Sequence, residues 1–518
     1  MSMESSGSPA ELKARSTRRW WALGAVTLSV LTIGLDTTVL SVALPTLAGA
    51  LHASESELQW FTSGYALALA AAMLPAGLLG DRFGRKRVLV IALALFAVGS
   101  AACAFAPGPG LFLAARLALG VAGAGITVMA VSALTVLFSD QERPRAIAVW
   151  AGANFLALPL GPILGGWLLS HFWWGWVFLI NVPVALIGLV AAVVLIPESR
   201  APGRTGLDPL GILASSAGLV AVTYGVIDAG QHGWGTPAAL GWIGGGILTL
   251  VAFFVGESRL ARRPEAHPLL DPALFRSARF TWGVALAAVT LLAMSGILFT
   301  MPQYFQAVLG ETAMDSGLRL LPLIGGMVVG LIPSARLAAR IGAKLTVTAG
   351  FVVIAAGMLL GTTTTRASSI LLVSAWMALV GAGTGLALST TASAALADLP
   401  ADRSGVGSAA MQAIQKLGAP FGAAIVGSVL LTGYRTRLDA AALPADTAGA
   451  AHHSVFAGLA AAQRLGSPAL ETAIQNAFLH GLTASLLAST VIAVIGAIAT
   501  LAFLPGHRRE SAESHGSP

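Results

Sequence analysis

The feature that most constrains this chain is a series of long apolar segments, each roughly 20 residues long, separated by short polar stretches. A helix of that length crosses the hydrocarbon core of a bilayer, where only helices and closed barrels satisfy their backbone hydrogen bonds. The sequence therefore predicts an all-α polytopic membrane protein. We count fourteen segments, with approximate cores at 21–47, 58–79, 88–106, 111–134, 146–169, 175–196, 209–228, 238–256, 280–301, 315–334, 346–362, 369–391, 405–432 and 480–504.

The composition excludes several other classes of protein. Only 10% of the 518 residues are charged and 56% are hydrophobic, whereas soluble proteins are near 25% charged. The one cysteine, Cys103, lies inside the third segment, so we expect neither a disulfide framework nor metal chemistry. The net charge of +7 is spread between the apolar segments and forms no single basic patch, so nucleic acid is not an expected partner.

Basic residues indicate which side of the membrane each loop occupies, because Lys and Arg in short loops stay on the cytoplasmic side. The loops of one side hold only Arg366, Arg435, Arg437 and Arg464. We therefore expect a multi-pass protein with both termini cytoplasmic. Arg heavily outnumbers Lys, and Ala and Gly are abundant, which suggests a GC-rich bacterial genome and hence a bacterial inner membrane. The cations of the cytoplasmic side lie in alternate loops and both tails, at 13–19, 82–87, 143–145, 200–204, 259–279, 336–344, 403 and 508–509.

The segments group as six, two and six. After the second segment comes Gly80-Asp81-Arg82-Phe83-Gly84-Arg85-Lys86, and a degenerate copy, 336–344, follows the tenth. Such internal repeats are typical of two-bundle transporters whose binding site lies between the bundles. We predict a cytoplasmic tail (1–19), a six-helix bundle (20–197), a linker with two additional transmembrane helices (198–278), a second six-helix bundle (279–505) and a cytoplasmic tail (506–518).

One predicted connection, 433–479, is much longer than the others and should be extracellular. Apolar residues within 454–475 recur at roughly helical spacing, which favours a helix on the membrane surface. A tether without regular structure is the alternative.

Among the 23 acidic residues, only Asp36 lies deep inside an apolar segment. An isolated carboxylate is costly to ionise in lipid, so its proton binding depends on whether water reaches it. That is the physical requirement for a proton carrier. The alternative is a permanent ion pair with Arg116 of the fourth segment. If the two are within reach, Arg116 would favour the charged carboxylate in one state and release it in another; otherwise Arg116 would bind backbone carbonyls.

Two further motifs carry chemistry. Asp81 stands beside four cations and could pair with Arg143 or Arg145 of the next cytoplasmic loop, so that breaking the pair would accompany opening. The cations alone would only set topology. In the fifth segment, Gly161-Pro162-Ile163-Leu164-Gly165-Gly166 predicts a kink and a smooth face for close helix packing.

These motifs resemble a known family. Gly77-x-x-Gly80-Asp81-Arg82-Phe83-Gly84-Arg85-Lys86 is similar to the cytoplasmic loop signature of the major facilitator superfamily, and 161–166 resembles its antiporter motif. Leu35-Asp36-Thr37-Thr38-Val39-Leu40, Leu58-Gln59-Trp60 and the stretch 174–183 resemble the fourteen-span drug:proton antiporters of the QacA/EmrB type. The motifs cover the first half well and the second half thinly.

The resemblance implies the major facilitator fold, two six-helix bundles plus two extra central helices, and proton-driven export of bulky hydrophobic compounds. It assigns Asp36 as a proton site with Arg116 as its partner, and Asp81 with Arg85 to cytoplasmic gating. The sequence departs from the family at Ser41, where Asn is usual, and at Gly175, where Arg is usual. The second half also lacks a deep acid, which argues against a site for dications.

Lys416 lies inside the thirteenth segment. Facing a central cavity, this cation would favour anionic or neutral substrates; otherwise it would extend toward an interface. Large or polar residues of central segments suit an adaptable apolar pocket, although each could equally be ordinary packing. The candidate substrate-binding residues are Gln59, Trp60, Tyr65, Met129, Asn154, Phe155, Phe299, Trp376, Gln412, Gln415 and Lys416.

The leading interpretation is therefore a proton-coupled exporter of hydrophobic drugs or antibiotics, expected to act as a monomer, with protons as the coupling ion and no cofactor. An alternative is a secondary carrier for one metabolite, peptide, siderophore or lipid, because one fold serves many substrates. A channel or receptor is the further alternative; a selective pore would require rings of like charge or aligned backbone carbonyls, which the sequence does not display. An enzyme is the least favoured, since we find no nucleophile with a matched base.

Overall fold

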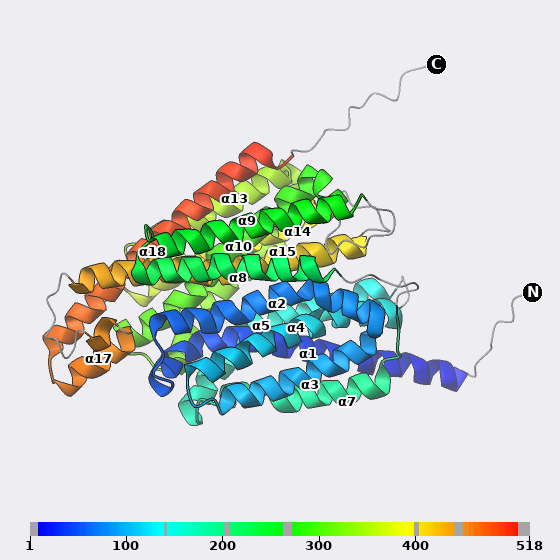
Figure 1. The fold of residues 1–518 in the computed structure, drawn as a ribbon, viewed down its shortest axis with the longest axis horizontal. Helices are drawn as coiled ribbons and strands as arrows, with labels where there is room; N and C mark the ends of the chain where they lie inside the picture. The colour runs from blue at the N-terminus through cyan, green and yellow to red at the C-terminus, as the bar shows by residue number, and fades with distance from the viewer. Residues whose placement is uncertain are drawn as a thin grey trace, which may run out of the picture.

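The computed structural model describes residues 9–138, 142–200, 208–262, 272–397, 404–439, 449–452 and 454–505. Within these ranges all regular structure is helical, and the long helices run side by side along one axis of the molecule (Figure 1). Each of the fourteen apolar segments predicted above falls on helices, to within two residues at its ends.

The first half contains seven helices in the described residues, and two more follow. Several start where a proline occupies the first turn, a position at which its missing N–H costs nothing. Ser54 caps α2 reciprocally with Glu57, the backbone N–H of Ser54 donating to the Glu57 carboxylate at 2.8 Å. The bounds are α1 (Pro9–Ala50), α2 (Glu55–Phe83), α3 (Arg85–Ala104), α4 (Pro109–Leu137), α5 (Arg143–His171), α6 (Trp176–Leu179), α7 (Asn181–Leu195), α8 (Pro209–His232) and α9 (Pro237–Leu260).

The second half begins with a short 3₁₀ turn, η1 (Pro272–Arg276). α10 contains Pro302 and passes into one turn of π-helix, η2 (Tyr304–Val308), which accommodates the lost hydrogen bond. The bounds of the α-helices are α10 (Ala278–Gln303), α11 (Ala313–Arg319), α12 (Leu321–Ile341), α13 (Ala343–Gly361), α14 (Ile370–Ala397), α15 (Ser404–Asp439), α17 (Val455–Arg464) and α18 (Pro468–Phe503).

The two largest hydrophobic cores in the described residues divide the helices into two bundles. One core consists of residues between Ala22 and Ile196, joined by only Phe299 and Ala413 from the second half. The other consists of residues between Leu286 and Leu504, joined by Val42 from the first half. The few shared residues mark where the bundles touch. α8 and α9 pack on each other, and α8 also contacts α2 and α15, so this pair lies across the junction of the bundles.

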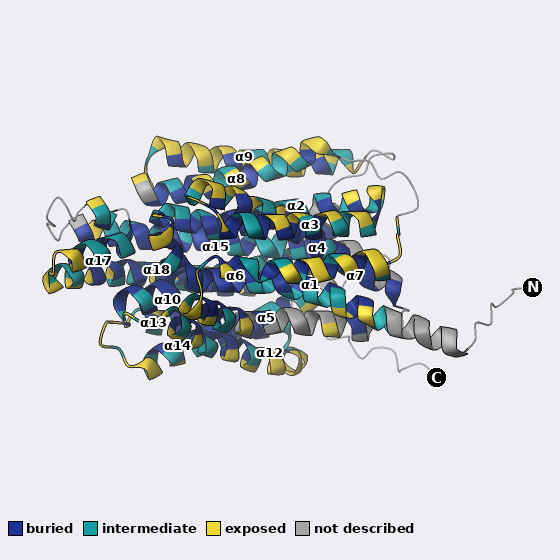
Figure 2. Ribbon diagram, turned by 90° about the horizontal axis from the view of Figure 1, so that it is seen from below, coloured by how far each residue is buried: buried dark blue, intermediate teal, exposed yellow. Residues whose placement is uncertain are grey.

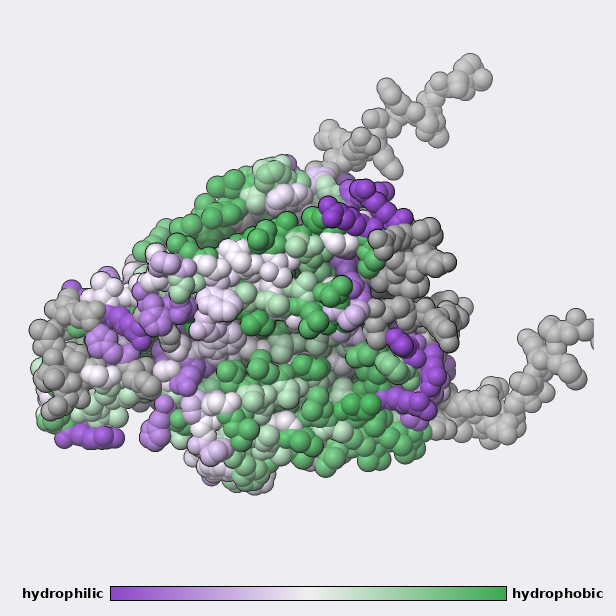
Figure 3. Space-filling view, in the orientation of Figure 1, coloured by the Kyte–Doolittle hydropathy of each residue, from purple (hydrophilic) through white to green (hydrophobic). Residues whose placement is uncertain are grey.

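The outer surface of the bundles is apolar where a soluble protein would be polar. Exposed residues follow the outer faces of α7 and α9 (Figure 2), and they include Ile187, Val190, Leu248 and Val251, each more than half exposed. One face shows apolar side chains over its middle and hydrophilic side chains toward both ends (Figure 3). Because water would disfavour such a surface, lipid is the solvent that explains it.

Twelve helices are long and apolar enough to cross a membrane in the described residues, or thirteen when α2 is counted as one span. α2 bends by 46° between Met73 and Pro75, where the proline ring interrupts the helix. The chain is thus a multi-pass membrane protein. Helix length and composition identify at most thirteen spans in the described residues, one fewer than the fourteen predicted.

Two segments predicted to lie outside the membrane contain ends of long helices. α1 begins at Pro9, inside the segment predicted as a tail. α15 continues to Asp439 and α18 begins at Pro468, so both ends of the predicted loop 433–479 are helical. These helix ends extend because they have packing partners: the Tyr434 hydroxyl donates to the Ala451 carbonyl at 2.9 Å, and Phe478 is buried in the second core. The helix expected within 454–475 is α17 followed by the first turns of α18.

Candidate functional site

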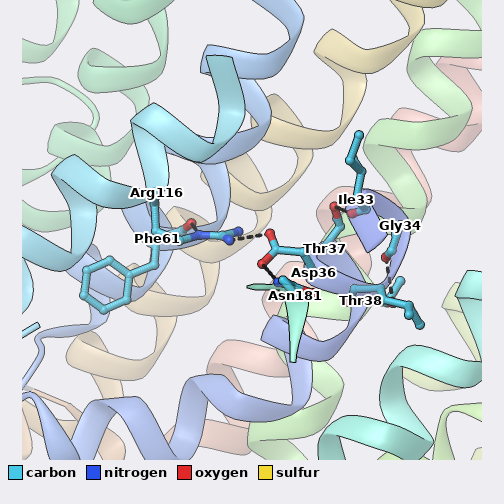
Figure 4. Close-up of polar contacts among 9 residues, drawn as sticks. Ile33, Gly34, Asp36, Thr37, Thr38, Phe61, Arg116 and Asn181 are labelled. Carbon is cyan, nitrogen blue, oxygen red and sulfur yellow. Dashed lines mark hydrogen bonds and ion pairs between the residues drawn. The ribbon is translucent and has the colours of Figure 1, made fainter. Parts of the chain in front are cut away.

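The deep acid of α1 is the centre of a buried polar network. The Asp36 carboxylate accepts a hydrogen bond from the Arg116 guanidinium of α4 at 2.5 Å and another from the Asn181 side-chain amide of α7 at 3.1 Å (Figure 4). The side chains of Asp36 and Arg116 are 0% and 1% exposed. Three helices that are distant in sequence therefore converge on one carboxylate away from both lipid and bulk water.

Arg116 has further partners from α2. Its Nε donates to the Phe61 carbonyl at 3.3 Å, and its guanidinium lies 4.2 Å from the centre of the Tyr65 ring. A buried guanidinium needs acceptors and gains from an aromatic face, and this site supplies both. Arg116 therefore makes both of the contacts considered for it from the sequence: an ion pair with Asp36 and a hydrogen bond to a backbone carbonyl.

A cavity of about 660 Å³ lies between the bundles, beside this network. Helices α1, α2, α4, α10, α12, α14 and α15 contribute to its wall, which is mostly apolar. Arg116 and Tyr65 reach the wall, as do Thr37 and Thr38, whereas Asp36 stands behind them. One layer of side chains thus separates the carboxylate from the cavity.

Four of the candidate substrate-binding residues line this cavity: Tyr65, Phe299, Gln412 and Lys416. Gln412 and Lys416 are four residues apart on α15, so they share one helix face. Gln415 is their neighbour in sequence but falls outside the cavity wall, because one residue turns a helix by about 100°.

The other candidates that the sequence placed in the cavity lie elsewhere. Gln59 is fully buried where the bundles meet and accepts a hydrogen bond from the Ser428 hydroxyl at 3.3 Å. Trp60 packs on Tyr224 of α8. Met129 is buried against the α-carbon of Gly80, and Trp376 is fully buried and donates its indole N–H to Thr364 at 3.2 Å.

Three predicted site residues have side chains that the structure does not describe. The side chains of Arg145, Asn154 and Phe155 lie outside the described part of the structure. Their roles therefore remain predictions, as does the expected pairing of Asp81 with α5.

Asp81 has a partner in its own loop. Its carboxylate accepts hydrogen bonds from Arg85 Nε at 3.1 Å and Nη2 at 2.9 Å. Gly84, between them, has φ of +110°, a backbone conformation that disfavours any other residue. Gly342 has φ of +87° at the matching position between α12 and α13, so the degenerate second copy preserves the turn although it has lost the acid.

The same loop is attached to the end of the first bundle. The Lys86 ammonium donates to the Val193 carbonyl at 2.6 Å, and the Arg85 backbone N–H donates to the Ser199 carbonyl at 3.0 Å. These contacts connect the loop between α2 and α3 to the segment after α7.

The glycines of 161–166 lie at two close helix contacts. Gly161 and Gly165 allow α5 to approach Thr38 and Val39 of α1 within the first bundle. Gly166 faces the backbone of Met314 in α11, where an added Cβ would lie only 2.6 Å from the Met314 α-carbon. Gly166 is therefore at a seam between the two bundles.

Replacing Gly166 by Ala should force this seam open, because the obstructing atoms are backbone and cannot rotate away. In a Cys103→Ala background, we expect Ser428→Cys, buried where the bundles meet, to react several-fold faster with an impermeant maleimide. Gly244→Ala on α9 is the matched control, since open space surrounds that position. Equal reactivity in the two variants would mean that the seam does not hold the bundles together.

Sequence reasoning missed Asn181 as part of the site. It stands at the first position of α7, at the head of a strongly apolar helix. A buried amide at the start of such a segment is costly without a partner, and that signal could have identified it. The roles of the Phe61 carbonyl and of the Tyr65 ring could not have been found, because both depend on the packing of α2 against α4.

Residues 26–423 match the family model described as Major Facilitator Superfamily. The multidrug efflux pump LfrA of Mycolicibacterium smegmatis is 35% identical over 452 residues, which are 87% of this chain and 88% of that protein. The tetracenomycin C resistance and export protein of Streptomyces glaucescens is 33% identical over 414 residues, 80% of this chain and 76% of that one.

Solved structures share the fold at lower identity. A bacterial homologue of the human lysosomal transporter Spinster, crystallised in an inward-facing and unoccupied conformation, has a TM-score of 0.66 at 17% identity, covering 94% of this chain and 98% of that one. A D-xylose–proton symporter has a TM-score of 0.59 at 15% identity, covering 94% and 98%. At such identities the likeness concerns the fold alone.

Proposed function

The chain belongs to the Major Facilitator Superfamily, and we propose that it is a proton-coupled antiporter that exports hydrophobic drugs or antibiotics across a bacterial inner membrane by alternating access. One observation carries the proposal: the buried Asp36–Arg116 pair lies at an apolar cavity between two bundles, with Arg116 in the cavity wall and Asp36 directly behind it. The efflux and export proteins among its relatives support the direction of transport and the class of substrate.

The chemistry of coupling follows from the pair. While Asp36 is ionised, it holds Arg116 by a short charge-assisted hydrogen bond. A proton on Asp36 cancels one of the two charges, so the pair weakens and Arg116, which lines the cavity, gains freedom to move. The same movement would admit water to the carboxylate. Proton binding and the shape of the cavity are thereby linked, which is what an exchanger needs.

The closed side of the molecule lies toward the loops poor in basic residues. There the Gln306 side-chain amide donates to the Val42 carbonyl at 3.1 Å, and the Ser63 hydroxyl donates to the Pro420 carbonyl at 3.2 Å. Both bonds join one bundle to the other. The cavity continues in the opposite direction, to Val30 of α1 and Ser393 of α14. We assign this arrangement to the inward-facing state.

The topology we propose has fourteen spans: the thirteen counted in the described residues and α5, which is 29 residues long and packs against α1. α1 begins and α18 ends at the same end of the molecule (Figure 1), as an even number of crossings requires. Together with the basic loops, this supports two cytoplasmic termini. The proposed organisation is two six-helix bundles, 20–197 and 279–505, with the linker 198–278 between them, in a monomer.

The test uses purified chain in proteoliposomes loaded with a fluorescent hydrophobic drug. An imposed pH gradient should drive the drug against its concentration gradient, and a protonophore should abolish this movement. Structurally unrelated drugs should all be substrates. Accumulation of one compound alone would instead favour a carrier for a specific metabolite, and movement that does not depend on the gradient would contradict proton coupling.

A further inference from the structure

The cavity between the bundles has one cation that its surroundings do not neutralise. The charged residues in its described wall are Arg116 and Lys416. Arg116 is paired with Asp36 at 2.5 Å, so that pair has no net charge. For Lys416, no hydrogen bond or ion pair joins its ammonium to any described residue. The described wall therefore carries a net positive charge.

The position of Lys416 does not favour extension of its side chain to the membrane surface. It stands in the middle of α15, between Gln412 and Ala419, which line the cavity on the same helix face. One turn further on, at Pro420, α15 is in hydrogen-bond contact with Ser63 of α2, so this part of α15 faces the other bundle and not lipid. An ammonium in this position is costly unless a ligand compensates it.

We propose that the cavity binds amphipathic organic anions, with the ionised acid group, a carboxylate or phenolate, on Lys416 and the apolar ring system against the aliphatic wall. Lipophilic cations are disfavoured because the wall holds an uncompensated positive charge and no described carboxylate that faces the ligand. This rests on the proposed function, since it names the substrate class of the same cavity.

The test measures binding, which needs no pH gradient. Two dyes with one ring system and opposite charge serve as probes: fluorescein, an anion, and a rhodamine ester, a cation. Fluorescence anisotropy with the purified full chain should show fluorescein bound about tenfold more tightly or better. Lys416→Gln should weaken fluorescein binding about tenfold and leave the rhodamine ester unchanged or bound more tightly.

The controls separate charge from packing. Lys416→Arg keeps the charge and should retain most of the affinity for fluorescein, while Gln415→Ala alters the neighbouring residue outside the cavity wall and should bind as the parent does. The proposal is wrong if the parent chain prefers the rhodamine ester or binds neither dye, or if Lys416→Gln weakens both dyes equally. Selective anion binding without gradient-driven transport would instead refute the proposed coupling and leave this inference intact.

Discussion

Replacing Asp36 by Asn is expected to abolish drug accumulation driven by a pH gradient, while drug exchange without a gradient continues. The amide has nearly the shape of the carboxylate and can still accept a hydrogen bond from Arg116, so the network of α1, α4 and α7 should keep its geometry. The amide cannot bind and release a proton near neutral pH, so loading and unloading of the proton stops. Gradient-driven uptake and counterflow, measured in the same proteoliposomes, give the two readouts.

The matched control is Asp228→Asn in α8. Asp228 pairs with His232 on its own helix at 2.8 Å and takes no part in the cavity wall. The Asp228→Asn variant should show gradient-driven uptake and counterflow close to those of the parent chain. If Asp36→Asn retains full gradient-driven accumulation, then Asp36 is a structural member of an ion pair and the coupling carboxylate lies elsewhere.

Replacing Arg116 by Ala should impair both stability and coupling. The substitution leaves the Asp36 charge fully buried with only Asn181 as a donor, and breaking a buried pair in this way typically costs about 3–5 kcal/mol. Without Arg116, a proton on Asp36 no longer releases a partner in the cavity wall, so proton binding is no longer linked to the shape of the cavity. We therefore expect a clear fall in thermal stability of the purified chain and no gradient-driven transport.

A double variant distinguishes these two effects. Asp36→Asn combined with Arg116→Gln removes both charges and keeps polar side chains of similar shape, so most of the stability lost in Arg116→Ala should return. Transport should not return, because no carboxylate remains. If transport recovers along with stability, Arg116 and Asp36 serve folding alone and the proton takes another path.

Much of the fold could be predicted because lipid imposes a simple rule on sequence. The apolar segments correspond to helices throughout the described residues, since a backbone in hydrocarbon has few alternatives. The pairing of Asp36 with Arg116 could also be predicted from the sequence. Two opposite charges deep in apolar segments gain free energy by pairing, and few other partners for either charge lie in those segments.

Other features depend on how helices rotate and pack, and sequence spacing does not report rotation. Gln59 and Trp60 occupy the same turn of α2 as the cavity residue Thr62, yet one is sealed between the bundles and the other packs on α8. Trp376 is polar enough to suit a binding site, but Thr364 satisfies its indole within the second bundle. The helical ends of the loop 433–479 were not predicted, because contacts with neighbouring residues stabilise these ends of α15 and α18.

The sequence by itself determined that the chain crosses a membrane many times as helices and that it carries a deep acid, because burial in lipid penalises every charge and every unpaired peptide group. Only the tertiary structure decided that Asn181 and the Tyr65 ring complete the environment of that acid, that Gly166 meets the backbone of α11, and that Lys416 faces a cavity. Those outcomes depend on contacts between distant helices, whose relative rotation is set by the packing of the whole bundle.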